Sequence, residues 1–236
     1  MKLSILIPVF NEQSTIEELV SRVVAVQYPC LYEVLLIDDC SQDRTFEKLE
    51  RIQRQKHGHV ISVFRNSVNM GKGAAIRQGL KHLTGDIVIV QDADNEYDPD
   101  EIPKLVEPIL AGQADAVYGS RFKEAWHPEG MGFLSWAANR TLTTLTNVLY
   151  RARLTDMETC YKAVRASLLD DIELRCNRFD FEPDITAQLL KRKIDILELP
   201  VTYLGRSAED GKKVRARDFL QAVWVLLRDR FSRIQS

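Results

Sequence analysis

The chain has 236 residues, 45% of them hydrophobic, and a formal net charge of −2. This length and composition fit a globular α/β protein with a real core, and the charge excludes a protein built to coat nucleic acid. The apolar N-terminal run is too short for a signal peptide and no run reaches the roughly 20 apolar residues that cross a bilayer, so we expect a cytoplasmic protein, in solution or at the inner face of the membrane.

The first half of the chain alternates apolar runs with helical patterns. The apolar runs are continuous and rich in β-branched residues, which is typical of strands buried on both faces. They cover residues 3–10, 33–37, 61–64, 86–90 and 114–118. The helical patterns cover residues 14–26, 45–56, 73–83 and 99–111, and Ser14 with Glu17 has the spacing of a capping box. This alternation predicts an α/β fold with a doubly wound, mostly parallel sheet and helices on both faces.

The second half departs from this alternation. Residues 134–150 and 180–192 are predicted helices, and 194–203 is a predicted strand that Pro200 places at a sheet edge or a bulge. A long helix is predicted over 215–233. We expect a single domain over 1–213, followed by a C-terminal amphipathic appendage over 214–236.

Polar clusters follow three predicted strands at their carboxyl ends, where open α/β sheets bind ligands. Phe10-Asn11-Glu12 follows the first strand, Asp38-Asp39 the second, and Asp92-Ala93-Asp94-Asn95-Glu96 the strand that ends at Val90. Asp92 and Asp94 project to the same side and could share Mg²⁺ or Mn²⁺ with substrate phosphates. A lone Asp-x-Asp is a weak signal, and Asp38-Asp39 could instead cap the helix from Thr45. The placement of the clusters at successive strand ends favours a site.

Four rival classes of site lack their sequence signatures. The first turn is acidic and has no glycine, unlike a dinucleotide-binding turn, and Gly71-Lys72-Gly73 lacks the spacing of a P-loop. A nucleotidyltransferase would carry a loop rich in glycine and basic residues after the first strand. The four cysteines are widely spaced, so a zinc site is not expected either.

A set of motifs spans nearly the whole chain, as far as about Lys213. They are IPVFNE at 7–12, DDCSQDRT at 38–45, NMGKGAAIRQG at 69–79, DAD at 92–94 with Asp98-Pro99, GSR at 119–121, DMETCYK at 156–162 and FDFEPD at 179–184. With these motifs the chain resembles family 2 glycosyltransferases of the GT-A fold, and among them the dolichyl- or polyprenyl-phosphate mannose or glucose synthases. Two departures are Cys40, where Gly or Asn is usual, and the absence of the paired membrane helices that many relatives carry after the catalytic domain.

The resemblance implies roles for residues on the donor side. The nucleotide would be bound by Pro8, Phe10, Glu12, Asp39, Lys72, Arg77 and Asp92, with Asp39 accepting a hydrogen bond from the base. Asp92 would lie against the nucleotide sugar and phosphates, and Asp94 would hold the metal, Mg²⁺ or Mn²⁺. Glu96 stands where related enzymes use a Gln as a further ligand. Catalytic roles would fall to Asp92, Asp94, Arg121 and Asp156.

The implied reaction is an inverting, metal-dependent transfer of a hexose from a GDP- or UDP-sugar to a polyprenyl (dolichyl or undecaprenyl) phosphate. Arg121 and Arg140 would receive the acceptor phosphate, which is largely dianionic at pH 7 and needs no general base. A hydroxyl acceptor such as a saccharide would need one, and Asp156 and Glu182 are then the candidates. GDP-mannose and UDP-glucose both remain open as donors. A module that binds nucleotide-sugar without catalysing transfer is a further alternative. The presence of Asp92, Asp94 and Arg121 argues against it.

The C-terminal segment is basic and amphipathic. From residue 204 onward there are eight basic and four acidic side chains. Apolar residues recur at three- and four-residue intervals, namely Phe219, Leu220, Val223, Trp224, Leu226, Leu227 and Phe231. This pattern fits a peripheral membrane contact through 215–233, and it fits equally a helix packed on the protein's own core or on another chain.

Overall fold

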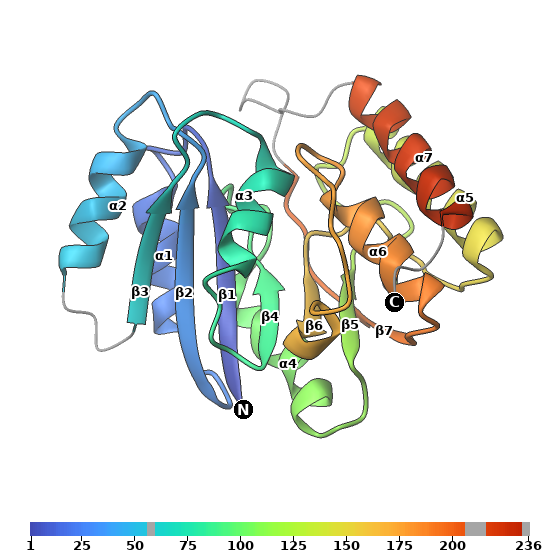
Figure 1. Ribbon diagram of the computed structural model, residues 1–236, viewed down its shortest axis with the longest axis horizontal. Helices are drawn as coiled ribbons and strands as arrows, with labels where there is room; N and C mark the ends of the chain where they lie inside the picture. Colours follow the sequence, from blue (N-terminus) through green and yellow to red (C-terminus); the bar gives the residue numbers. More distant parts are fainter. Residues whose placement is uncertain (56–59, 206–215, 233–236) are drawn as a thin grey trace.

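The computed structural model describes residues 1–55, 60–205 and 216–232. Within these ranges it has one seven-stranded sheet with helices on both faces (Figure 1). The strands are β1 (Lys2–Val9), β2 (Leu31–Asp38), β3 (Val60–Arg65), β4 (Ile87–Val90), β5 (Ala116–Ser120), β6 (Lys162–Arg165) and β7 (Ile196–Pro200). The α-helices are α1 (Ile16–Ala25), α2 (Thr45–Arg54), α3 (Lys72–Leu80), α4 (Ile102–Leu110), α5 (Phe133–Tyr150), α6 (Phe181–Lys191) and α7 (Ala216–Phe231), with short 3₁₀ helices η1 (Pro99–Glu101) and η2 (Ala166–Leu168).

The sheet has the strand order β3-β2-β1-β4-β6-β5-β7. Its neighbours pair in parallel except where β6 pairs with β4 and β5, and both of those pairings are antiparallel. The prediction of a doubly wound, mostly parallel sheet is therefore confirmed. Pro200 ends β7, which pairs only with β5 at the edge of the sheet, as its missing N–H requires.

One detail of the sequence prediction is wrong, and one strand is missing from it. The predicted capping box of Ser14 and Glu17 does not form, because α1 begins at Ile16 with Thr15 at its N-cap and no side-chain capping bond. The hydroxyl of Thr15 instead donates to the Glu12 carboxylate at 2.9 Å and the Ala93 carbonyl at 3.0 Å. Strand β6 is absent from the prediction, because its four residues are too few to show a periodic pattern.

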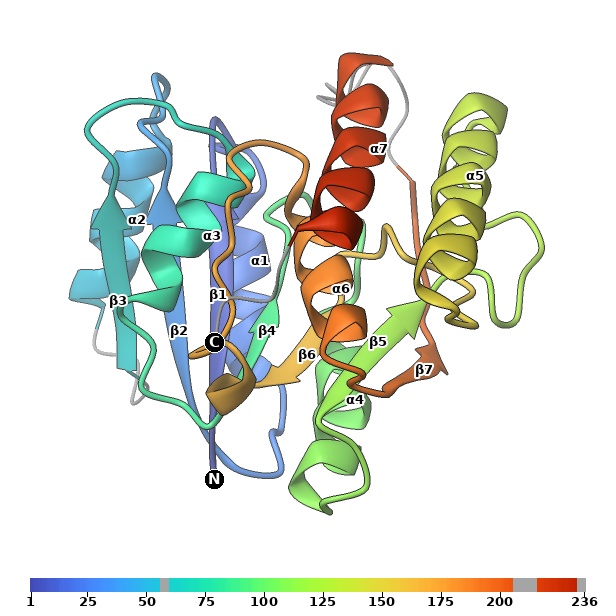
Figure 2. The same ribbon diagram turned by 45° about the vertical axis from the view of Figure 1, so that its right-hand side comes forward.

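The C-terminal helix belongs to the packed body of the protein. The main apolar core is built from the strands of the sheet and the helices packed on it. A second apolar cluster forms where α5, α6 and α7 meet, with Leu142, Ala187 and Leu226 buried in it (Figure 2). The predicted domain boundary between 213 and 214 lies outside the described residues, as do the predicted helix ends at Lys56, Arg215 and Arg233. Among the helices of the described ranges, none combines the length and the apolar character needed to cross a membrane.

Candidate active site

The carboxyl ends of β1, β2 and β4 meet at one edge of the sheet, the upper edge in Figure 1. A hollow of about 240 Å³ lies there. Its lining includes seven residues predicted from the sequence, namely Pro8, Phe10, Glu12, Asp39, Lys72, Asp92 and Asp94. The parallel register explains this convergence, because residues that end neighbouring parallel strands come to the same edge. We call this hollow the donor pocket.

Asp39 fixes the loop that enters α3. Its carboxylate accepts the backbone N–H groups of Met70 at 3.0 Å and Gly71 at 2.6 Å, and the side-chain amide of Asn66 at 2.8 Å. Gly71 has a φ of +97°, and a Cβ there would meet the Asn177 carbonyl at 2.5 Å, so only glycine fits. The structure thus gives Asp39 a loop-holding task, while its predicted contact with the base stays a prediction.

Lys72 lies between two carboxylates in the wall of the donor pocket. Its ammonium is 2.7 Å from Asp92 Oδ1 and 2.8 Å from Glu182 Oε1. Burial works against the charge of Lys72, but Asp92 and then Glu182 outweigh it and hold its pKa well above the usual value. A permanent cation therefore stands beside Asp92, where it can attract a diphosphate.

Asp94 and Asp92 are the acidic groups of the donor pocket that suit a divalent cation. Asp94 Oδ1 accepts the backbone N–H of Glu96 at 3.2 Å, and Glu96 accepts the Tyr203 hydroxyl at 2.9 Å. Over the described ranges, no three His, Cys, Asp or Glu side chains cluster as a ligand set. The donor set therefore fits a hard cation held by one or two carboxylates and completed by substrate phosphate oxygens and water. Asp92 shares its carboxylate with the Lys72 ammonium, and Asp94 remains the predicted metal ligand.

Arg121 follows β5 and is locked by Asp156. The Asp156 carboxylate accepts the backbone N–H, Nε and Nη2 of Arg121 at 2.7–3.0 Å, and Asn139 Oδ1 accepts Nη2 at 2.8 Å. The two charged side chains are 8% and 0% exposed. Asp156 thus orients the guanidinium. Because its carboxylate already accepts three N–H groups of Arg121, Asp156 is poorly suited to act as a general base.

Arg140 of α5 shares an aromatic neighbour with Arg121. The guanidinium carbons of the two arginines lie 5.5 and 5.7 Å from the centre of the Phe122 ring, and Arg140 also lies 4.9 Å from that of Trp126. The Arg140 guanidinium makes no hydrogen bond or ion pair with any part of the chain that the structure describes, and its contacts there are with these rings. The structure therefore brings together the two arginines that were predicted to receive a phosphate.

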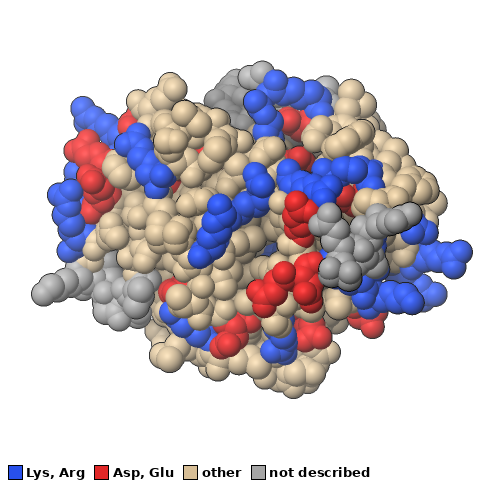
Figure 3. Space-filling view, viewed as in Figure 1, with Lys and Arg blue, Asp and Glu red and all other residues tan. Residues whose placement is uncertain are grey.

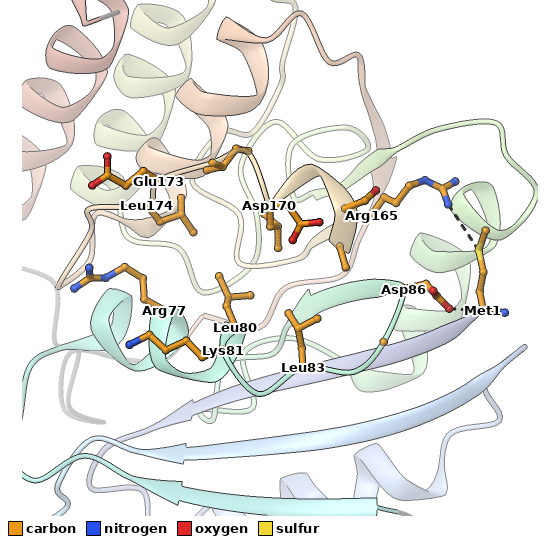
Figure 4. A pocket seen from close by; sticks show the side chains of 15 residues that line it. Met1, Arg77, Leu80, Lys81, Leu83, Asp86, Arg165, Asp170, Glu173 and Leu174 are labelled. Atoms are coloured by element: carbon orange, nitrogen blue, oxygen red, sulfur yellow. Dashed lines mark hydrogen bonds and ion pairs between the residues drawn. The ribbon is translucent and has the colours of Figure 1, made fainter. Parts of the chain in front are cut away.

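Arg77 lies away from the donor pocket, in contrast to its predicted place near the nucleotide. It comes five residues after Lys72 on α3, which turns it by about 140° around the helix axis. It lines a second hollow of about 570 Å³ between α3 and residues 165–174, together with Leu80, Lys81 and Glu173 (Figure 4). Its Nη2 donates to Asn177 Oδ1 at 2.7 Å.

Seven lining residues were not predicted as site residues, and two of these come from a distant part of the chain. Arg178 and Phe179, in the loop before α6, complete the donor pocket. The carbonyls of Asn177 and Arg178 accept the N–H groups of Ala74 and Gly73 in the first turn of α3, so this loop is held against the pocket. The FDFEPD motif begins at Phe179, but its spacing does not indicate a contact with residues more than 100 positions earlier in the chain.

Comparisons of the chain with known proteins find a matching family model and related proteins. Residues 4–173 match the family model described as glycosyl transferase family 2. The chain is 29% identical over 234 residues to a dolichol-phosphate mannosyltransferase of Pyrococcus furiosus, covering 97% of this chain and 64% of that protein. It is 34% identical over 216 residues to an undecaprenyl-phosphate 4-deoxy-4-formamido-L-arabinose transferase of Sodalis glossinidius, covering 89% and 62%. The chain thus spans less than two thirds of the length of these relatives.

Solved structures share the fold. Glucosyl-3-phosphoglycerate synthase from Mycobacterium tuberculosis, in complex with Mn²⁺, UDP and glucosyl-3-phosphoglycerate, superposes with a TM-score of 0.72 at 20% identity, covering 97% of this chain and 79% of that one. S. aureus TarS 1–349 in complex with UDP-GlcNAc gives a TM-score of 0.65 at 20% identity, covering 97% and 66%. These likenesses establish the GT-A fold.

Proposed function

The chain belongs to glycosyl transferase family 2, and on that basis we propose that it transfers a hexose from a nucleoside diphosphate sugar to a polyprenyl phosphate, with inversion at the anomeric carbon. The observation that carries the proposal is the pairing of two charged sites at one sheet edge. The donor pocket with Lys72, Asp92 and Asp94 lies beyond β1 and β4, and Arg121 lies beyond β5. A sugar that moves between them has an anion-binding group on either side.

The donor side supplies charge for a diphosphate. Lys72 is the fixed cation, and Asp94, with Asp92 beside it, would hold Mg²⁺ or Mn²⁺. A divalent cation bound there would neutralise negative charge on the departing diphosphate. The structure of glucosyl-3-phosphoglycerate synthase, which shares the fold and contains Mn²⁺ and UDP, supports this choice of cofactor and nucleotide class. Whether the base is guanine or uracil is set by contacts that Asp39 and Phe10 would make.

The acceptor side favours a phosphate over a hydroxyl. A phosphate monoester oxygen attacks the anomeric carbon, the bond from that carbon to the diphosphate breaks, and the nucleoside diphosphate leaves with the electron pair. The dianion carries no proton that must be removed first. Asp156 is occupied by Arg121 and Glu182 by Lys72, so neither is a free base for a hydroxyl. The names of the two relatives contain dolichol phosphate and undecaprenyl phosphate, and these names support the same acceptor class.

A transfer assay with matched acceptors tests this proposal. Polyprenyl phosphate and the corresponding polyprenol are offered in the same detergent, with GDP-mannose, UDP-glucose and their relatives as donors. We expect transfer to the phosphate alone, since only the phosphate pairs with Arg121 and Arg140. Transfer to the polyprenol or to a saccharide, with none to the phosphate, contradicts the acceptor assignment.

We further propose that α7 contacts an anionic membrane surface. One face of α7 buries Ala222, Val225 and Leu226 in the protein, while another exposes Leu220, Trp224, Leu227 and Phe231. Its two acids, Asp218 and Asp229, are only 7% and 2% exposed, so the exposed charges of the described helix are Arg217 and Arg230. Two copies of this face would bring like charges together, whereas anionic headgroups would complement them. Figure 3 shows further basic side chains around α6 and α7.

Vesicle sedimentation tests the α7 contact. We expect the wild type to pellet with phosphatidylglycerol vesicles, and Trp224→Ser with Phe231→Ser to remove most of that binding, because the aromatic anchors are lost. Leu31→Ser, at an equally exposed apolar side chain on β2, is the control. Unchanged pelleting of the double variant contradicts the contact, and so does a wild-type dimer in solution that the double variant abolishes.

A further inference from the structure

The loop before β6 lies between the donor and acceptor sides. Because β6 is antiparallel, it begins where β4 and β5 end, with Ala163 beside Ile89 and Lys162 beside Tyr118. The residues just before β6 therefore occupy the sheet edge between the end of β4, which leads to Asp92, and the end of β5, which leads to Arg121. Glu158 stands in the middle of this loop.

The loop is held on both sides of Glu158. Asp156 pairs with Arg121, and the Cys160 thiol lies 3.5 Å from the Val90 carbonyl on β4. From below, the buried ammonium of Lys162 donates to the Met157 carbonyl at 2.8 Å and the Thr159 carbonyl at 2.5 Å. The backbone on either side of Glu158 is thus held by contacts within the protein.

One oxygen of the Glu158 carboxyl has no hydrogen-bond partner in the described chain. Its Oε1 is shielded from solvent without a hydrogen bond, although the residue as a whole is half-buried. Oxygens buried in this way are nearly always hydrogen-bonded, and exceptions call for an explanation. Burial first, and then the charge of Glu182, raise the pKa of Glu158 to about 8, against the opposing effects of Lys162 and Arg121. A carboxyl that keeps its proton at pH 7 can donate as well as accept.

We propose that Glu158 binds a hydroxyl of the sugar in transit and so helps to select the donor. The inference rests on the proposed function, since a hexose must lie between the donor diphosphate and the acceptor phosphate. The loop of Glu158 spans that interval, and a sugar hydroxyl would supply the partner that Oε1 lacks. A site that hydrogen-bonds a hydroxyl discriminates strongly against an analogue without it, because the buried group is then left unpaired.

Binding measurements on Glu158 variants separate a sugar contact from damage to the pocket. For wild type, Glu158→Gln and Glu158→Leu, titration gives the affinity for the nucleoside diphosphate alone and for the full nucleotide-sugar. We expect the diphosphate affinity to stay within about twofold, while Glu158→Leu weakens nucleotide-sugar binding by roughly 10- to 100-fold and Glu158→Gln by less. Glu107→Leu, an exposed glutamate on α4, is the matched control.

Deoxy-sugar donors then identify the contact. One deoxy analogue should bind wild type and Glu158→Leu alike, since the hydroxyl that Glu158 binds is already missing. Equal loss with every analogue overturns the inference, as does a nucleotide-sugar affinity that Glu158→Leu leaves unchanged. If wild type binds the nucleotide-sugar and shows this pattern but transfers nothing to a lipid phosphate, the proposed function fails while the Glu158 contact stands.

Discussion

Replacing Asp94 with Asn should reduce metal-dependent sugar transfer by roughly 10²- to 10³-fold while the fold stays intact. The loss is expected because a neutral amide replaces the carboxylate that is proposed to hold the cation beside the donor diphosphate. The fold should survive, since Asp94 is half-buried and the oxygen of the new amide can still accept the Glu96 N–H. Transfer rates across a Mn²⁺ titration, with thermal unfolding alongside, give the measurement.

A nearby carboxylate provides the control for this variant. Asp100 lies six residues after Asp94, is exposed, and does not line the donor pocket. Asp100→Asn should therefore leave both the transfer rate and its dependence on metal unchanged. Full activity of Asp94→Asn with unaltered metal dependence removes Asp94 from the metal site. Equal losses in both variants indicate a general electrostatic effect of charge on this segment.

Replacing Arg121 with Ala should destabilise the protein by about 3–5 kcal/mol and abolish efficient use of the acceptor. Asp156 is fully buried and would keep its charge without its partner, which is the source of the destabilisation. Urea unfolding measures the stability, and the acceptor KM measures the binding defect. Replacing Asp156 in the same chain, as in Arg121→Met with Asp156→Leu, should recover much of the stability without recovering acceptor use.

Replacing Arg140 tests the acceptor site in the same way, without the loss of stability expected for Arg121→Ala. Its guanidinium has ring contacts only, to Phe122 and Trp126, within the described ranges. Arg140→Ala should therefore raise the acceptor KM about tenfold, with little change in stability. Normal acceptor KM in Arg140→Ala, or full transfer activity in the Arg121/Asp156 double variant, contradicts the assignment of these arginines to the acceptor phosphate.

The donor pocket could be predicted from the sequence because a parallel sheet gathers its strand ends. Each cluster followed an apolar run that was long enough to identify as a strand, so the common edge followed from the fold class. For Arg77, by contrast, the sequence predicted a place in the donor pocket that the structure does not show. Membership of the same motif as Lys72 implied a common site, whereas helix geometry turns the two side chains to different faces of α3.

On the acceptor side, prediction from the sequence was limited because the key contact joins residues far apart in the chain. Arg121 and Asp156 are 35 residues apart, and their ion pair depends on β6 entering the sheet antiparallel between β4 and β5. A four-residue strand containing a buried lysine carries no periodic signal, so neither the pair nor the place of Glu158 could be predicted. For α7 the sequence showed one apolar stripe, and packing on α5 and α6 divided it into a buried and an exposed face.

The most direct measurement of the central claim is the stoichiometry of transfer by the wild-type protein. With polyprenyl phosphate, the matching donor and Mn²⁺ present, nucleoside diphosphate and lipid-linked sugar should accumulate in equal amounts, and neither should form when the phosphate acceptor is replaced by polyprenol. Release of nucleoside diphosphate without lipid-linked sugar, at the same rate with either lipid, would contradict the account.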